Sequence, residues 1–288
     1  MEKAKYRRLI IPVITVMLAV GMLAGFLLPR LVSFGGRREE LIITNLDVGK
    51  ADSAVITLGG RTGIIDTGTD EAYETIDSFL KNNNISGIDF LLITHYDRDH
   101  IGSAVELIEN YPIDKILLPD YVSEKELYSP LMDCIADMDG VQFVDRKLSF
   151  DFGKAAVTVY PADDPGPLLE NEKNRDNDMS LVSMLSYGSC RMLFTGDIEN
   201  DRIKQMLDAG HDLSCDWIKI PHHGNYDKKD KALIKACSPV YAVVSTSPDV
   251  LDEKLTELIE DSGLKAYYTI YGNVTTVCSG SGIKVIDY

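Results

Sequence analysis

The chain has 288 residues, of which 45% are hydrophobic and 26% charged, the balance of a globular protein and not of a disordered one. Its Gly, Pro and Cys contents are too low for a fibrous protein or a small disulfide scaffold. The net charge of −16 is uneven, because residues 1–38 carry a net +6 and the remainder carries −22. A body this acidic repels polyanions, so we expect no general electrostatic surface for nucleic acid.

The first predicted element is an uncharged apolar run at residues 9–28. At about 1.5 Å per residue, it is long enough to cross the roughly 30 Å hydrocarbon core of a membrane. Four cations lie in the basic end at residues 1–8, so the positive-inside rule predicts a single-pass anchor in the cell membrane with the rest of the chain extracytoplasmic. A cleaved signal peptide, followed by secretion, is the alternative.

A short linker at residues 29–40 leads into the expected hydrolase domain at residues 41–288. From Leu41 onward, short apolar runs alternate with helical patterns, which is typical of a layered α/β fold. The polar stretch at residues 162–177 is rich in Pro, Gly and Asp and predicts a loop. Long loops often border a functional site, although this one is equally explained as solvated surface.

The strongest chemical signal is the run HYDRDH at residues 95–100. It follows the apolar strand predicted at residues 90–93 and precedes a helical pattern that begins at Ile101. Side chains at a strand end project into one crevice, so imidazoles and carboxylates in such a turn can converge on a metal ion.

Three further apolar runs end in a residue type that binds metals. The run at residues 63–65 is followed by Asp66, the run at 191–194 by Asp197, and the run at 217–220 by the pair His222 and His223. Four of the five histidines of the chain therefore lie at only two strand ends. Neither a core role nor a surface role explains all four together.

Six motifs in this order resemble the metallo-β-lactamase superfamily and, more closely, the hydrolase domain of ComEC-type DNA-uptake proteins. They are D-V-G-x-x-D (47–52), I-D-T-G (65–68), T-H-x-D-x-D-H-I-G (94–102), N-D-x-S-L-V (177–182), F-T-G-D (194–197) and P-H-H-G (221–224). The resemblance implies an α/β fold, a four-layer αββα sandwich preceded here by the transmembrane helix, with two divalent metal ions at one edge of the sheets.

The resemblance also implies the metal ligands. By position, His95 and Asp97 hold one ion, Asp99 and His100 hold the second, and Asp197 bridges the two. This oxygen-rich set shifts the preference from Zn²⁺ alone toward Mn²⁺ or a mixed site.

One of two adjacent histidines is expected to complete the second site. We favour His222 as the ligand and His223 as a phosphate or leaving-group contact. Asn177 and Ser180 match the N-x-x-S element that stands where other members of the superfamily supply a His ligand. Asp66 is expected to brace the ligand loop without binding metal.

The favoured function is an extracytoplasmic phosphodiesterase or nuclease-like hydrolase that uses a hydroxide held by the two ions. Asp99, Asp197 and His223 are predicted to act directly in catalysis, and Lys219 to support them or to contact the substrate. The expected partners are the membrane, through residues 9–28, and an anionic phosphodiester, with DNA as one candidate. Hydrolysis of a cell-envelope ester or amide, and a metal-stabilised binding domain without turnover, are the alternatives.

Overall fold

The structure of the protein, a computed structural model, describes residues 39–248 and 251–287. The expected basic end at residues 1–8 and the expected transmembrane helix at residues 9–28 lie outside the described residues, as does most of the linker. Within the described part of the chain, no helix is both long enough and apolar enough to cross a membrane.

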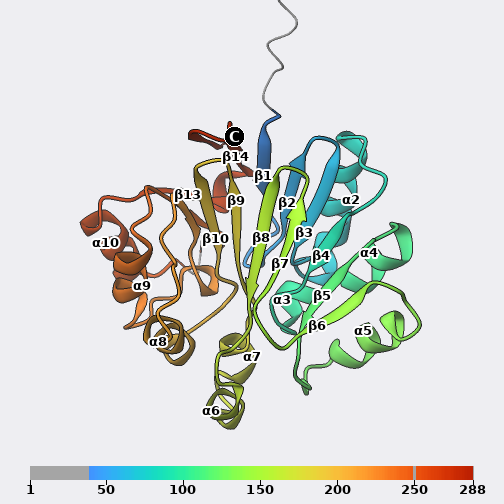
Figure 1. Ribbon diagram of the computed structural model, residues 1–288, viewed down its shortest axis with the longest axis horizontal. Helices are drawn as coiled ribbons and strands as arrows, with labels where there is room; N and C mark the ends of the chain where they lie inside the picture. The colour runs from blue at the N-terminus through green and yellow to red at the C-terminus, as the bar shows by residue number, and fades with distance from the viewer. Residues whose placement is uncertain (1–38, 249–250, 288) are drawn as a thin grey trace, which may run out of the picture. The chain divides into compact units, whose positions relative to one another are not determined.

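The first of two β-sheets has eight strands (Figure 1). They are β1 (Leu41–Asn45), β2 (Ala54–Leu58), β3 (Arg61–Ile65), β4 (Phe90–Leu92), β5 (Ile116–Pro119), β6 (Val141–Val144), β14 (Val274–Cys278) and β15 (Ile283–Asp287). Their spatial order is β15-β14-β1-β2-β3-β4-β5-β6. Pairing is antiparallel from β15 to β3 and parallel from β3 to β6.

The second sheet has seven strands. They are β7 (Leu148–Phe152), β8 (Ala155–Tyr160), β9 (Val182–Tyr187), β10 (Cys190–Phe194), β11 (Trp217–Lys219), β12 (Tyr241–Val244) and β13 (Lys265–Tyr268). Their spatial order is β13-β12-β11-β10-β9-β8-β7. Pairing is antiparallel from β7 to β10 and parallel from β10 to β13.

Helices cover the outer face of each sheet (Figure 1). Those on the first sheet are α2 (Tyr73–Asn82), α4 (Ala104–Asn110) and α5 (Tyr128–Ile135). Those on the second sheet are α8 (Asn200–Asp208), α9 (Asp230–Cys237) and α10 (Glu253–Asp261). The shorter helical segments are α3 (Arg98–Ile101), α6 (Pro165–Glu170), α7 (Arg175–Asp178), η1 (Asp70–Ala72), η2 (His222–Gly224) and η3 (Thr269–Tyr271).

Alternation along the strands explains the layers. In β4, Phe90 and Leu92 pack in the core between the two sheets, whereas Leu91 packs against the outer helices. In β10, Phe194 packs between the sheets and Leu193 packs outward. Successive side chains of a strand point to opposite faces, so a strand that is buried on both faces reads as a continuous apolar run. The described residues therefore form the four-layer α/β sandwich expected from the sequence.

The polar stretch at residues 162–177, expected to be a loop, instead contains α6 and most of α7. Pro165 stands in the first turn of α6, where a missing backbone N–H costs no helical hydrogen bond. Asp178, at the end of α7, is buried and accepts hydrogen bonds from the backbone N–H groups of Glu199 and Arg202. This contact with the start of α8 comes from the tertiary fold, and the local composition gave no sign of it.

Candidate metal centre

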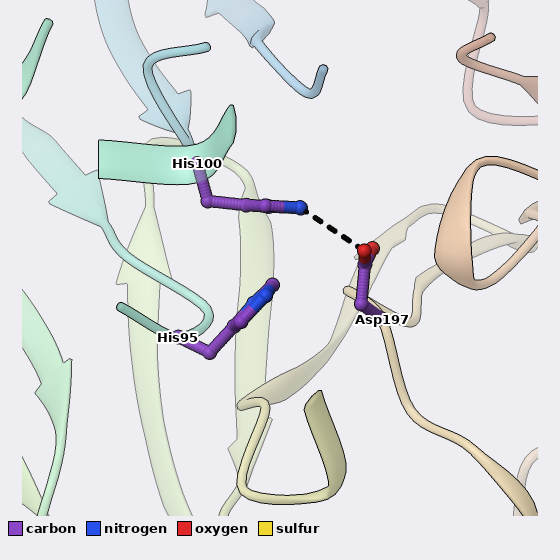
Figure 2. Close-up of side chains that lie close together, drawn as sticks. All are labelled: His95, His100 and Asp197. Carbon is purple, nitrogen blue, oxygen red and sulfur yellow. Dashed lines mark ion pairs between the residues drawn. The ribbon is translucent and has the colours of Figure 1, made fainter. Parts of the chain in front are cut away.

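The expected site residues lie in turns at the carboxyl ends of strands from both sheets. Asp66 follows β3 and residues 95–100 follow β4, while Asp197 follows β10 and residues 222–223 follow β11. Within each sheet the two strands are parallel neighbours, so their turns emerge side by side. Figure 2 shows the result, in which His95 and His100 from the first sheet reach toward Asp197 from the second.

Four side-chain atoms lie close together at this edge. His223 Nε2 lies 3.1 Å from Asp197 Oδ2, 3.2 Å from Asp99 Oδ2 and 3.3 Å from His100 Nε2. His100 Nε2 also lies 3.3 Å from Asp197 Oδ2. Ligand atoms about 2.0–2.1 Å from a tetrahedral ion are themselves about 3.3 Å apart. Asp99, His100 and His223 each offer one ligand atom within 4.8 Å of the others, so these three residues could hold one cation, and Asp197 lies beside them.

Hydrogen bonds fix which ring nitrogen of His95 and of His100 faces the centre. The Nδ1 atom of His100 lies 2.8 Å from Asp66 Oδ2, and the Thr94 hydroxyl donates to the same oxygen at 2.8 Å. The Thr94 hydroxyl has a single hydrogen, so it can only accept from the Nδ1–H of His95, 3.0 Å away. Both imidazoles thus carry a hydrogen on Nδ1 and turn Nε2 toward the centre, as metal-binding histidines do.

His223 is oriented in the same way. Its Nδ1 lies 3.1 Å from the backbone oxygen of Ser245, which can only accept, so Nε2 is left for the centre. The backbone of His223 has φ 53° and that of Asp66 has φ 59°, in the left-handed region that non-glycine residues seldom adopt. Such backbone strain persists where surrounding contacts impose it, and it concentrates at functional sites.

His95 belongs to a second group of candidate ligands. Its Nε2 is buried and has no hydrogen-bond partner among the described residues. One ligand atom from each of His95, His100 and Asp197 lies within 4.8 Å of the others. A buried polar atom without a partner is costly, and a cation between His95 and Asp197 would satisfy it. We call this place the His95 site.

Asp97, expected to share an ion with His95, instead forms an ion pair with a lysine. Its Oδ1 lies 2.8 Å from the Nζ of Lys125, which comes from the segment between β5 and α5. Within the described residues, none of the groups that could hold a metal includes Asp97.

A buried lysine lies beside Asp197. The Nζ of Lys219 contacts Asp52 Oδ2 and lies 3.8 Å from Asp197 Oδ1. Burial opposes the charge of the ammonium, but the carboxylates of Asp52 and Asp197 outweigh burial and raise the pKa of Lys219. Lys219 therefore offsets part of the negative charge of Asp52 and of the candidate ligand Asp197.

The carboxylates attract positive charge to the histidines. Burial alone would lower the pKa of His223, but Asp197, Asp52 and Asp99 raise it to about 9. Burial likewise opposes the charge of His100, and Asp197 and Asp66 raise its pKa well above the usual value. For His95, burial dominates and lowers the pKa to about 3, so this imidazole is neutral and able to bind a metal. The carboxylates that favour protonated His100 and His223 would equally stabilise a metal cation at the same place.

His222 lies in a neighbouring polar cluster. Its Nε2 is 3.4 Å from Asn177 Nδ2, and its Nδ1 is 3.5 Å from Glu199 Oε1. Asn177 also donates to Glu199 at 2.9 Å. Ser180, the other member of the N-x-x-S element, accepts a hydrogen bond from the backbone N–H of Asp197.

The structure thus brings together four of the expected ligands, namely His95, Asp99, His100 and Asp197. His223 occupies the place for which His222 was favoured, and the side chain of His222 faces Glu199 instead. Three contributing residues, Asp52, Lys125 and Ser245, were not expected from the sequence. Asp52 lies in the D-V-G-x-x-D motif, which could have marked it, whereas nothing in the sequence marks the other two.

A sequence model of the metallo-beta-lactamase superfamily matches residues 46–247, more than half of the chain, and the chain belongs to this superfamily. It is 24% identical over 219 residues to ComE operon protein 3 of Bacillus subtilis, covering 69% of this chain and 27% of that protein. It is 27% identical over 235 residues to the competence protein ComA of Neisseria gonorrhoeae, covering 79% and 30%. The expected resemblance to ComEC-type proteins is thereby confirmed.

More distant matches include the endoribonuclease YSH1 of Yarrowia lipolytica, 26% identical over 200 residues, covering 62% of this chain and 22% of that protein. The chain spans less than a third of the length of each of these curated relatives.

Solved structures share the fold at low identity. The metallo-beta-lactamase fold protein YhfI of Bacillus subtilis has a TM-score of 0.58 at 9% identity, covering 83% of this chain and 100% of that one. CmlA of Streptomyces venezuelae, a diiron β-hydroxylase, has a TM-score of 0.53 at 14% identity, covering 87% and 54%. A fold shared with a hydroxylase does not determine the reaction, so the function has to be argued from the site.

Proposed function

We propose that this protein is a metal-dependent hydrolase that cleaves phosphodiester bonds. The observation that carries the proposal is the common orientation of His95, His100 and His223. Each has its Nδ1 engaged by an oxygen and its Nε2 turned toward Asp197 or toward a neighbouring ligand. This arrangement supports metal binding, because a metal-binding histidine usually donates its other ring N–H to an oxygen, which fixes the ring orientation.

Divalent ions bound there would lower the pKa of water toward neutrality and neutralise negative charge that develops on a phosphoryl oxygen. The protein residues would have separate tasks. Asp99, His100 and His223 would hold one ion, His95 would hold another, and Asp197 lies within reach of both. Asp66 and Lys219 would keep these ligands oriented and partly neutralised.

We also propose that the two adjacent histidines have the reverse of the roles favoured from the sequence. His223 would be the metal ligand. His222, partly exposed and held by Glu199 and Asn177, would contact the substrate and supply a proton to the leaving group. A histidine beside a carboxylate is a common proton donor in hydrolases.

The phosphodiester is favoured over an ester or amide because of the relatives. By name, one is a competence protein and one is an endoribonuclease. The net charge of −22 outside residues 1–38 argues against a broad grip on nucleic acid, so we propose that the contact is confined to the metal centre. Mn²⁺ and Zn²⁺ are the candidate ions, because the ligand set mixes carboxylate oxygen with imidazole nitrogen.

We further propose that residues 9–28 anchor the protein in the membrane and that the catalytic domain is extracytoplasmic. The uncharged run and the cations that precede it support this proposal.

The function is tested with purified full-length protein, Mn²⁺ or Zn²⁺, single-stranded DNA and bis-p-nitrophenyl phosphate. We expect hydrolysis of the small diester, and Asp197→Asn should abolish it while leaving the urea unfolding curve close to that of the wild type. Cleavage of the small diester but not of DNA would restrict the function to small phosphodiesters. Activity that survives Asp197→Asn would contradict the proposed centre.

A further inference from the structure

Four of the five cysteines are buried, and they lie in two pairs. Cys215 stands two residues before β11, and Cys237 is the last residue of α9. The backbone N–H of Cys215 donates to the carbonyl oxygen of Cys237 at 2.9 Å, and a side-chain hydrogen bond joins the two thiols. Residues that share backbone hydrogen bonds in a sheet have Cα atoms about 5.5 Å apart, within the roughly 4.4–6.8 Å that a disulfide spans.

The second pair connects the two sheets. Cys190 begins β10 and Cys278 ends β14, and both pack in the core between the sheets. Beside them, the turn between β9 and β10 contacts the turn between β14 and β15, where the Ser189 N–H donates to the Gly280 carbonyl oxygen at 2.9 Å. A side-chain hydrogen bond joins the thiols of this pair as well.

The thiols of the folded protein are poorly reactive. The Cys237 thiol and burial raise the pKa of Cys215 well above its ordinary value, and burial and the Cys278 thiol raise the pKa of Cys190 to about 12. Because the thiolate is the reactive form, these cysteines exchange slowly once they are buried. An oxidant therefore has to reach them while the chain folds.

We propose that two disulfides form when the protein folds in the presence of a disulfide oxidant, one within each pair, Cys215–Cys237 and Cys190–Cys278. In each pair, one thiolate attacks oxidised glutathione and releases one glutathione, and the second thiolate then displaces the other glutathione from the mixed disulfide. Each pair thereby loses two protons and two electrons, and one oxidised glutathione becomes two reduced ones. Oxidants of this class are typical of compartments outside the cytoplasm, where we propose that the domain lies.

The bridge between Cys215 and Cys237 would close a loop that contains β11 and η2. This loop carries the candidate ligand His223, so the bridge would hold the segment at both of its ends. The inference concerns folding and holds whether or not the protein is a hydrolase.

The experiment refolds reduced full-length protein from urea in two buffers, one with oxidised and reduced glutathione and one with reduced glutathione alone. Remaining thiols are alkylated after denaturation, and the protein is digested without reduction for peptide mass spectrometry. After oxidative refolding we expect alkylation at Cys134 alone, together with the linked peptides Cys215–Cys237 and Cys190–Cys278. The urea midpoint of this sample should exceed that of the reduced sample, because a crosslink lowers the entropy of the unfolded chain.

The matched control is Cys134→Ala, which removes the half-buried cysteine of α5 and should leave both linked peptides unchanged. Cys215→Ala should lose the first bridge and leave Cys237 alkylated, and Cys237→Ala gives the same test if that variant does not fold. Protein made by cell-free synthesis in the glutathione buffer is mapped in the same way, so the result does not depend on refolding. Linked peptides with other partners, or five free cysteines after folding with the oxidant, would overturn the inference.

Discussion

Asp66 determines the direction of the hydrogen bonds that orient His95 and His100 in the candidate metal centre. It is fully buried, and its carboxylate accepts from the backbone N–H of Thr94, from the Thr94 hydroxyl and from His100 Nδ1, each at 2.8 Å. Since it only accepts, the hydrogens of Thr94 and of His100 Nδ1 point toward it, and the Thr94 hydroxyl in turn accepts from His95 Nδ1. Asp66→Asn keeps the shape of the side chain, and asparagine tolerates the left-handed backbone at this position.

The amide introduced by Asp66→Asn would reverse the network. Its NH₂ group would donate to His100 Nδ1 and to the Thr94 hydroxyl, which would then donate to His95 Nδ1. Both imidazoles would carry their hydrogen on Nε2, the atom that faces the centre. The hydrogen bonds between residue 66, Thr94 and the Nδ1 atoms of His95 and His100 are all kept with reversed direction, so the free energy of unfolding should change by no more than about 1 kcal/mol. Metal affinity should fall about 10- to 100-fold, the usual effect of altering a residue that orients a ligand.

Competition with a chromophoric chelator measures the Zn²⁺ affinity, and urea unfolding without metal measures stability. The control is Asp89→Asn, the same substitution at a carboxylate that pairs with Arg61 at the surface of the first sheet, and it should leave metal affinity unchanged. Wild-type affinity in Asp66→Asn would refute the tautomer argument, as would a loss of affinity that merely follows from unfolding.

Two further predictions concern η2 and α9. His223→Asn should retain less metal after dialysis than His222→Asn, measured as the metal content per protein. Equal loss in both variants would count against the proposed exchange of roles. Burial raises the pKa of Asp230 to about 7 from its ordinary value of 3.8, so the protonated form stabilises the fold at low pH and this stability is lost as the pH rises through 7. Between pH 4 and pH 8, the free energy of unfolding of the wild type should therefore fall by up to about 4 kcal/mol more than that of Asp230→Asn. Parallel curves of unfolding free energy against pH would contradict this prediction.

The sequence predicted the turns of the site well because their signals are local. An apolar run buried on both faces and a polar residue soon after it identify a strand end, as at Asp66 and Asp197. Parallel strands in one sheet then bring such ends together without any further information. The layered fold and the meeting of the candidate ligand segments at one edge follow from this reasoning, whereas the individual ligand roles came from the resemblance.

What the sequence could not predict depends on the direction of single side chains. His222 and His223 are adjacent, and both have left-handed backbones with φ of 51° and 53°. Neither the residue type nor the backbone conformation therefore distinguishes them. The proposed choice of His223 depends on the Ser245 carbonyl, directly after β12, which holds the Nδ1 atom of His223. The pairing of Lys125 with Asp97 is equally invisible, because about 27 positions separate them and no motif includes Lys125.

The charge of the candidate metal centre connects the acidic composition with the binding of an anionic substrate. Five carboxylates, those of Asp52, Asp66, Asp97, Asp99 and Asp197, face two ammonium groups, Lys125 and Lys219, so the group is formally negative when the histidines are neutral. One divalent ion leaves this formal charge negative, and a second makes it positive. A phosphodiester anion that approaches a body of net charge −22 should therefore bind when both ions are present and not when only one is bound.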